Sequence, residues 1–68
     1  MNVLIEQLLD ELEVAFPLPR YKVRYDTEDG TFQVDDTQTG GRGSFQFNMF
    51  DPASPSDVVR WLKRQLGQ

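Results

Sequence analysis

Residues 20–35, RYKVRYDTEDGTFQVD, decide the fold, because they hold two alternating runs joined by an Asp-Gly turn. Apolar side chains occupy every second position of both runs; they are Tyr21, Val23, Tyr25, Phe32 and Val34. A two-residue period is typical of half-buried strands, and Asp-Gly is among the strongest short hairpin signals. The stretch therefore predicts an antiparallel hairpin of strands 20–26 and 31–35 with one apolar face.

A glycine-rich segment and a third alternating run follow the hairpin. Residues 36–43 contain three glycines and predict a mobile loop. Residues 44–50, SFQFNMF, again alternate, with Phe45, Phe47 and Met49 on one face. Because short connections favour antiparallel neighbours, this run predicts a third strand that extends the hairpin into a meander.

An amphipathic helix is predicted on each side of the strands. Residues 2–16 begin at Asn2, a good N-cap, and end before Pro17. Their apolar face comprises Leu4, Ile5, Leu8, Leu9, Leu12, Ala15 and Phe16. Ser54 as N-cap and Pro55 at the first helical position begin the second helix. Its buried stripe comprises Val58, Val59, Leu62 and Leu66.

The element order is α-β-β-β-α, which predicts an α+β fold with a three-stranded antiparallel meander. Each helix has one apolar stripe and the sheet has one apolar face, so the simplest two-layer arrangement packs both helices on that face. A chain of 68 residues is too short for two cores and predicts one domain, 1–68.

This architecture resembles that of double-stranded-RNA-binding domains, which contact RNA through the first helix, the first strand connection and the start of the last helix. The corresponding regions here carry acidic residues. They are Glu6, Asp10, Glu11 and Glu13, then Asp26, Glu28 and Asp29, then Asp51 and Asp57. The resemblance implies the fold, and the charges argue against RNA binding.

Composition excludes several kinds of chemistry. The chain has no Cys and no His, which excludes disulfides, Cys/His zinc sites and histidine acid–base catalysis. Residues 26–30 begin like a calcium loop, but Gly30 comes one residue early and Thr37 stands where a Glu is needed. The glycines of 40–43 precede a strand, whereas a phosphate loop precedes a helix. We therefore predict no enzyme and no cofactor or metal.

The N-terminal stretch MNVLIEQLLDELEV has no basic leader, and its apolar runs are short. A signal peptide needs an apolar stretch of about 7–15 residues, and a membrane span needs about 20. We therefore predict a cytoplasmic protein with no membrane segment.

Charge is segregated along a chain whose net charge is −4. Two basic stripes are predicted, Arg20, Lys22 and Arg24 on the outer sheet face and Arg60, Lys63 and Arg64 on the last helix. The outer face is predicted to expose Arg20, Lys22, Arg24, Thr31, Gln33, Asp35, Ser44, Gln46 and Asn48. The stripes serve either solubility and edge protection or docking on a protein of mixed charge.

We predict a small non-catalytic protein-interaction module, an adaptor, inhibitor or regulator of the kind that phages and mobile elements encode. Trp61 lies at the edge of the last helix's apolar stripe and is predicted to be partly exposed. The candidate interaction surface is Arg20, Lys22, Arg24, Arg42, Gln46, Asn48, Arg60, Trp61 and Arg64. The alternative is a nucleic-acid-binding protein that uses the basic outer sheet face and the Arg42 loop, although the acidic net charge makes nucleic acid a poor partner.

The third strand also predicts self-association. Residues 44–50 carry no charge, proline or glycine, and an unguarded edge of this kind invites pairing with another chain. A two-fold homodimer through strand 44–50, or a partner protein that adds a strand there, is expected. The opposing prediction is a monomer whose 36–43 loop or sheet twist covers this edge.

Overall fold

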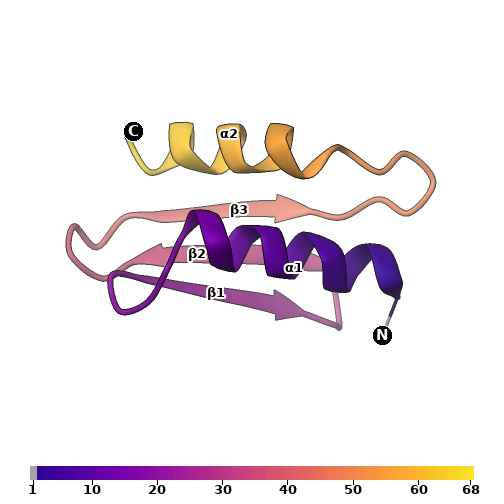
Figure 1. Cartoon of the computed structure of the whole chain (residues 1–68), viewed down its shortest axis with the longest axis horizontal. Coiled ribbons are helices and arrows are strands. Elements are labelled where there is room, and N and C mark those ends of the chain that lie inside the picture. The colour runs from indigo at the N-terminus through magenta and orange to yellow at the C-terminus, as the bar shows by residue number, and fades with distance from the viewer. Residues whose placement is uncertain (1) are drawn as a thin grey trace.

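A computed structural model describes residues 2–68 and confirms the α+β fold. The elements are α1 (Val3–Ala15), β1 (Tyr21–Asp26), β2 (Thr31–Asp36), β3 (Arg42–Gln46) and α2 (Pro55–Gln65). The sheet order is β1-β2-β3, and both neighbouring pairs are antiparallel. Figure 1 shows both helices running along the strand direction, with α1 in front of the sheet and α2 beside β3.

One apolar core holds the two layers together. Its buried side chains are Ile5, Leu8, Leu12, Phe16, Tyr21, Phe32, Val34, Val58 and Leu62. They come from both helices and from the inner positions of the strands, so both helices cover the same face of the sheet. The Phe16 and Tyr21 rings meet edge to face at 5.2 Å, which joins the end of α1 to β1.

The predicted helix starts are confirmed. The Asn2 side chain accepts a hydrogen bond from the Leu4 N–H at 2.7 Å, and the Ser54 hydroxyl accepts one from the Asp57 N–H at 3.3 Å. These bonds satisfy N–H groups that have no partner within the helix.

The prediction that Leu4 belongs to the buried face of α1 was wrong, because its side chain is 45% exposed. Figure 1 shows the first turn of α1 reaching beyond the ends of the strands, where the sheet cannot cover it. Deeper in the helix the predicted stripe holds, and Ile5, Leu8 and Leu12 are buried.

The predicted bounds of the third strand were also wrong. The strand is Arg42–Gln46 instead of 44–50, and Met49, expected on the inner face, lies beyond it with 55% exposure. The reason is the register with β2: Gly43 pairs with Val34, and Gln46 already pairs with Thr31, the first residue of β2. A Cβ atom on Gly43 would lie 3.2 Å from Leu62 Cδ2 and 3.4 Å from the Leu62 carbonyl oxygen. Glycine is therefore required here so that α2 can approach the strand closely.

The segment predicted as a mobile loop, 36–43, is a hydrogen-bonded connection. Asp36 is the buried last residue of β2, and Arg42 and Gly43 belong to β3. The Gly40 N–H donates to the Asp36 carbonyl oxygen, and the Asp36 N–H donates to the Gly41 carbonyl oxygen, both at 2.8 Å. Gly40 has a φ of +78°, which favours glycine at this turn.

Candidate interaction surface

The predicted outer face of the sheet is confirmed as a polar surface. None of its nine predicted side chains is buried, and those nearest the edges of the sheet are the most exposed. The period of two therefore placed these nine side chains on the correct face.

The cations of this face are held by a central carboxylate. Asp35 on β2 accepts from the Arg24 guanidinium of β1 at 3.0 Å and from the Arg42 Nε of β3 at 3.1 Å. Each exposed ion pair of this kind contributes about 0–1 kcal/mol. Arg42, predicted in a loop, is thus a strand residue, Asp35 links all three strands, and the charge of the stripe is partly neutralised.

Arg20 forms a second ion pair, at the start of β1. Its Nε and one terminal nitrogen donate to the two carboxylate oxygens of Asp36 at 3.2 and 3.0 Å. This bidentate bond is the main cause that lowers the pKa of Asp36 to about 2, although burial opposes it; the N–H groups of Gln38 and Thr39 lower the pKa further. The same contact raises the pKa of Arg20. Arg20 therefore fixes the β2–β3 connection to β1.

The candidates on α2 form a separate cluster. Trp61 is 37% exposed, as predicted, and its ring lies 5.8 Å from the ring of Phe45. Arg60 donates to the Asp57 carboxylate at 2.6 Å. Arg64 is exposed and makes no ion pair within residues 2–68.

The side chains of Gln46 and Asn48 form hydrogen bonds with main-chain groups close to them. The Gln46 side-chain amide donates to the Asp29 carbonyl oxygen at 3.4 Å, and the Asn48 side chain accepts from the Phe50 N–H at 2.9 Å. The structure therefore divides the nine candidates among the outer face, α2 and the segment after β3.

The two edges of the sheet differ. On β3, the Ser44 main-chain N–H donates to the Gln65 side-chain oxygen, and the Gln65 side-chain nitrogen donates to the Ser44 carbonyl oxygen, both at 3.0 Å. A side chain of α2 thus occupies the centre of the edge that the sequence left unguarded. The alternating pattern could not show this contact, because Gln65 is 21 residues away.

The edge of β1 is open. The Thr37 N–H donates to the Arg20 carbonyl oxygen, which makes residues 20 and 37 a hydrogen-bonded pair. Because such pairs occur at every second position of an antiparallel ladder, residues 22, 24 and 26 direct their main-chain groups to β2. The main-chain groups of Val23 and Tyr25 therefore point away from β2. The Tyr21 N–H is satisfied by the Pro17 carbonyl oxygen at 3.2 Å. Within residues 2–68, the N–H groups of Val23 and Tyr25 have no such partner.

A groove of about 410 Å³ runs beside this open edge. Its lining comes from the end of α1, the connection to β1 and β1 itself: Glu13, Phe16, Pro17, Leu18, Tyr21, Lys22, Val23 and Arg24. Five of these eight residues are apolar or aromatic, Lys22 and Arg24 are basic, and Glu13 is the one acidic residue of the lining. Sequence reasoning missed this groove, because its two walls meet only when α1 packs on the sheet.

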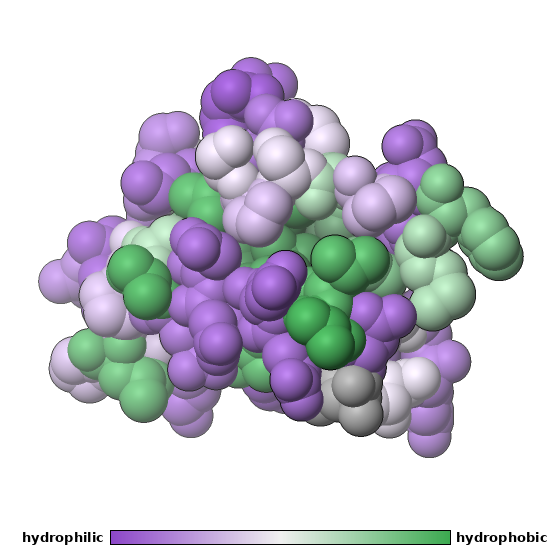
Figure 2. Space-filling view, turned by 45° about the vertical axis from the view of Figure 1, so that its right-hand side comes forward, coloured by the Kyte–Doolittle hydropathy of each residue, from purple (hydrophilic) through white to green (hydrophobic). Residues whose placement is uncertain are grey.

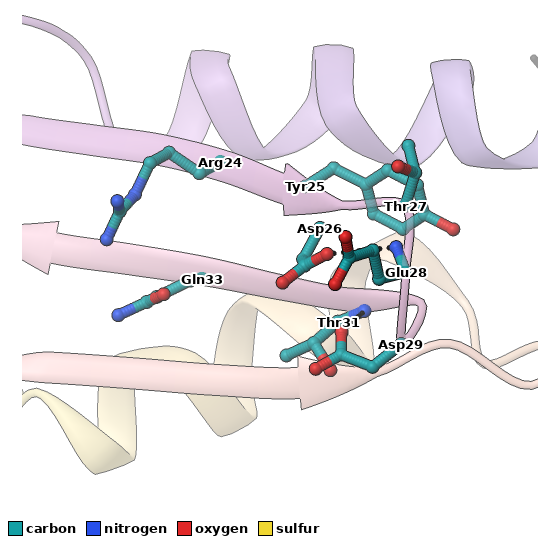
Figure 3. Close-up of a pocket in the computed structure, with 8 residues that line it drawn as sticks. All are labelled: Arg24, Tyr25, Asp26, Thr27, Glu28, Asp29, Thr31 and Gln33. Atoms are coloured by element: carbon teal, nitrogen blue, oxygen red, sulfur yellow. Dashed lines mark hydrogen bonds between the residues drawn. The ribbon is translucent and has the colours of Figure 1, made fainter.

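A second hollow, of about 520 Å³, lies at the β1–β2 turn (Figure 3). Two of its three carboxylates are engaged by the turn itself: Asp26 accepts from the Glu28 N–H at 2.9 Å, and Asp29 accepts from the Thr31 N–H at 3.1 Å. Among residues 2–68, no three carboxylates converge in a group suited to a metal ion.

Neither described helix is long and apolar enough to cross a membrane. Comparison of the chain with protein-family models, with curated proteins and with solved structures finds no match. The resemblance to double-stranded-RNA-binding domains therefore rests on element order and layer arrangement.

Proposed function

We propose that this protein is a small non-catalytic module that binds another protein through surface complementarity. The observation that supports this best is the exposure of large apolar side chains at both ends of α1. Phe50 is 94% exposed, Val14 80% and Leu18 75%. Single exposed apolar residues are ordinary, but apolar side chains that gather in one place are typical of interaction sites.

The gathering is visible on the surface. Figure 1 places the start of α1 and the segment between β3 and α2 at the same end of the molecule. Figure 2 turns this end forward and shows apolar side chains around it. The exposed apolar residues of these two segments are Val3, Leu4, Met49 and Phe50. The opposite end of α1 contributes Val14 and Leu18.

Protein binding is favoured over nucleic-acid binding because three of the four outer-face cations are engaged in ion pairs. Arg24 and Arg42 share Asp35, and Arg20 holds Asp36. A nucleic-acid partner would instead need cations free to replace counterions along the phosphates. Self-association through 44–50 stays a prediction, and Gln65 on that edge argues for a different partner.

Site-specific photocrosslinking tests the proposal. A photoreactive residue at Phe50 or Leu18 should give protein adducts in a lysate of the cells that encode the chain, and excess unlabelled protein should compete them away. The same group at Gln38, exposed in the polar β2–β3 turn, is the control and should give few adducts. Adducts that nuclease removes, or equal labelling from all three positions, would refute protein binding through these apolar side chains.

A further inference from the structure

We propose that the open edge of β1 binds an extended segment of a partner protein in which apolar side chains alternate with acidic ones. This inference rests on the proposed protein-binding function and gives it a surface and a ligand chemistry. The partner segment would join the sheet as a fourth strand beside β1.

The main chain supplies the first part of the argument. Val23 and Tyr25 direct their N–H and carbonyl groups away from β2, and the connection before β1 satisfies only the N–H of Tyr21. An added strand can therefore bond to both residues without displacing any existing bond. On β3, by contrast, an added strand would have to displace Gln65 from Ser44.

The groove supplies the second part. Successive side chains of an added strand point to opposite faces of the sheet. Those that point toward α1 would enter the groove of about 410 Å³, whose apolar lining includes Phe16, Leu18 and Val23. Glu13 at the same groove would repel an acidic side chain. The positions of the partner that face α1 should therefore be apolar.

The charges of β1 supply the third part. The intervening side chains of the partner would lie on the outer face, beside Lys22 and Arg24. Lys22 makes no ion pair within the described part of the chain, and Arg24 is bonded to Asp35 through one nitrogen only. Acidic side chains pair favourably with cations across neighbouring strands, whereas like charges repel. The outer positions of the partner should therefore be acidic.

The same charges disfavour a second copy of this chain as the occupant. Antiparallel pairing of two β1 strands centred on Val23, the middle of the open edge, would place Lys22 of each copy against Arg24 of the other. A different protein with acidic side chains at these positions fits the edge better.

A synthetic peptide provides the direct test. The probe is an end-blocked heptapeptide of alternating glutamate and valine, and the control has the same composition with its valines consecutive. In ¹⁵N NMR titrations, the alternating probe should bind with a dissociation constant below about 1 mM and slow the hydrogen exchange of the Val23 and Tyr25 N–H groups. Equal binding of both peptides, no saturable binding, or protection at Ser44 in place of Val23 would overturn the inference.

Paired variants test each part separately. Lys22→Glu should weaken the probe at least about fivefold, whereas Lys63→Glu, an equal charge change on exposed α2, should leave binding within about twofold. Val23→Pro removes an edge N–H without removing a bond to β2 and should abolish binding. Leu18→Ala, with Gln7→Ala at an exposed polar position of α1 as its control, tests the groove if Val23→Pro fails to fold. Equal effects of Lys22→Glu and Lys63→Glu would overturn the assignment of the acidic positions.

The outcomes separate this inference from the proposed function. Protein adducts from Phe50 together with no binding of the alternating peptide would overturn the β1 edge and leave protein binding intact. An absence of protein adducts from Phe50, together with no binding of the alternating peptide, would overturn both the β1 edge and the proposed protein-binding function.

Discussion

Gly43→Val tests the packing of α2 on the sheet, because the sequence pattern and the structure predict opposite changes in the free energy of unfolding. Valine is a strong strand former and would extend the apolar alternation of β3, so pattern alone predicts a gain of up to about 1 kcal/mol. In the structure, Gly43 is buried beneath α2, and its added Cβ alone would approach Leu62 Cδ2 to 3.2 Å. The two methyl groups of valine have no space there.

The expected size follows from these contacts. Overpacking a filled core costs about 1–3 kcal/mol, and we take the upper value because the Leu62 carbonyl oxygen at 3.4 Å belongs to the backbone. Subtracting the gain in strand propensity leaves a loss of about 2 kcal/mol. A domain of this size without disulfides has a free energy of unfolding of about 3–5 kcal/mol, so the variant should lose about half of its stability. Its Tm should fall by about 8–16 °C.

The measurement is thermal and urea unfolding followed by circular dichroism. Ser44→Val is the matched control, because Ser44 is the next residue of β3 and its side chain is exposed on the outer face. This control should change stability by no more than about 0.5 kcal/mol. An unchanged or raised Tm for Gly43→Val would refute the close approach of α2 to β3.

A double variant identifies the contact. Leu62→Ala alone leaves a cavity and should cost about 2–5 kcal/mol. Gly43→Val adds three carbon atoms where Leu62→Ala removes three, so the double variant should be more stable than Leu62→Ala alone. A cost of Gly43→Val that persists in full in the Leu62→Ala background would show that the clash lies elsewhere.

Three further outcomes are expected. The pKa of Asp36 is about 2 and therefore below its unfolded value, so the stability that its carboxylate contributes is present above about pH 4 and is lost as the pH falls toward 2. The Tm difference between wild type and Asp36→Asn should shrink over that window. A constant difference would contradict the ion pair. Gln65→Ala removes two bonds to Ser44, should cost about 1 kcal/mol, and should raise the mass seen by light scattering if the opened β3 edge pairs. Acrylamide should quench Trp61 in the native protein, and more strongly after Phe45→Ala, since that ring covers one side of the indole; equal quenching would contradict the contact.

The sequence determined the elements whose signals are local. The alternation around Asp29-Gly30 defined the hairpin, and Asn2 and Ser54 marked the helix starts, because strand period, turn and cap each depend on a few neighbouring residues. Apolar spacing also predicted that both helices share one face, since the sheet offers one apolar surface.

Only the tertiary structure decided the features that join distant residues. The alternation of SFQFNMF continues to Met49, yet β3 begins at Arg42 and ends at Gln46, because Gln46 pairs with Thr31, the first residue of β2, and β2 offers no partner beyond it. The burial of Asp36 by Arg20, 16 residues away, and the cover that Gln65 gives to β3 carry no periodic signal. Which edge of the sheet stays open was therefore set by packing, since a strand's alternation fixes its faces and leaves its edges undetermined.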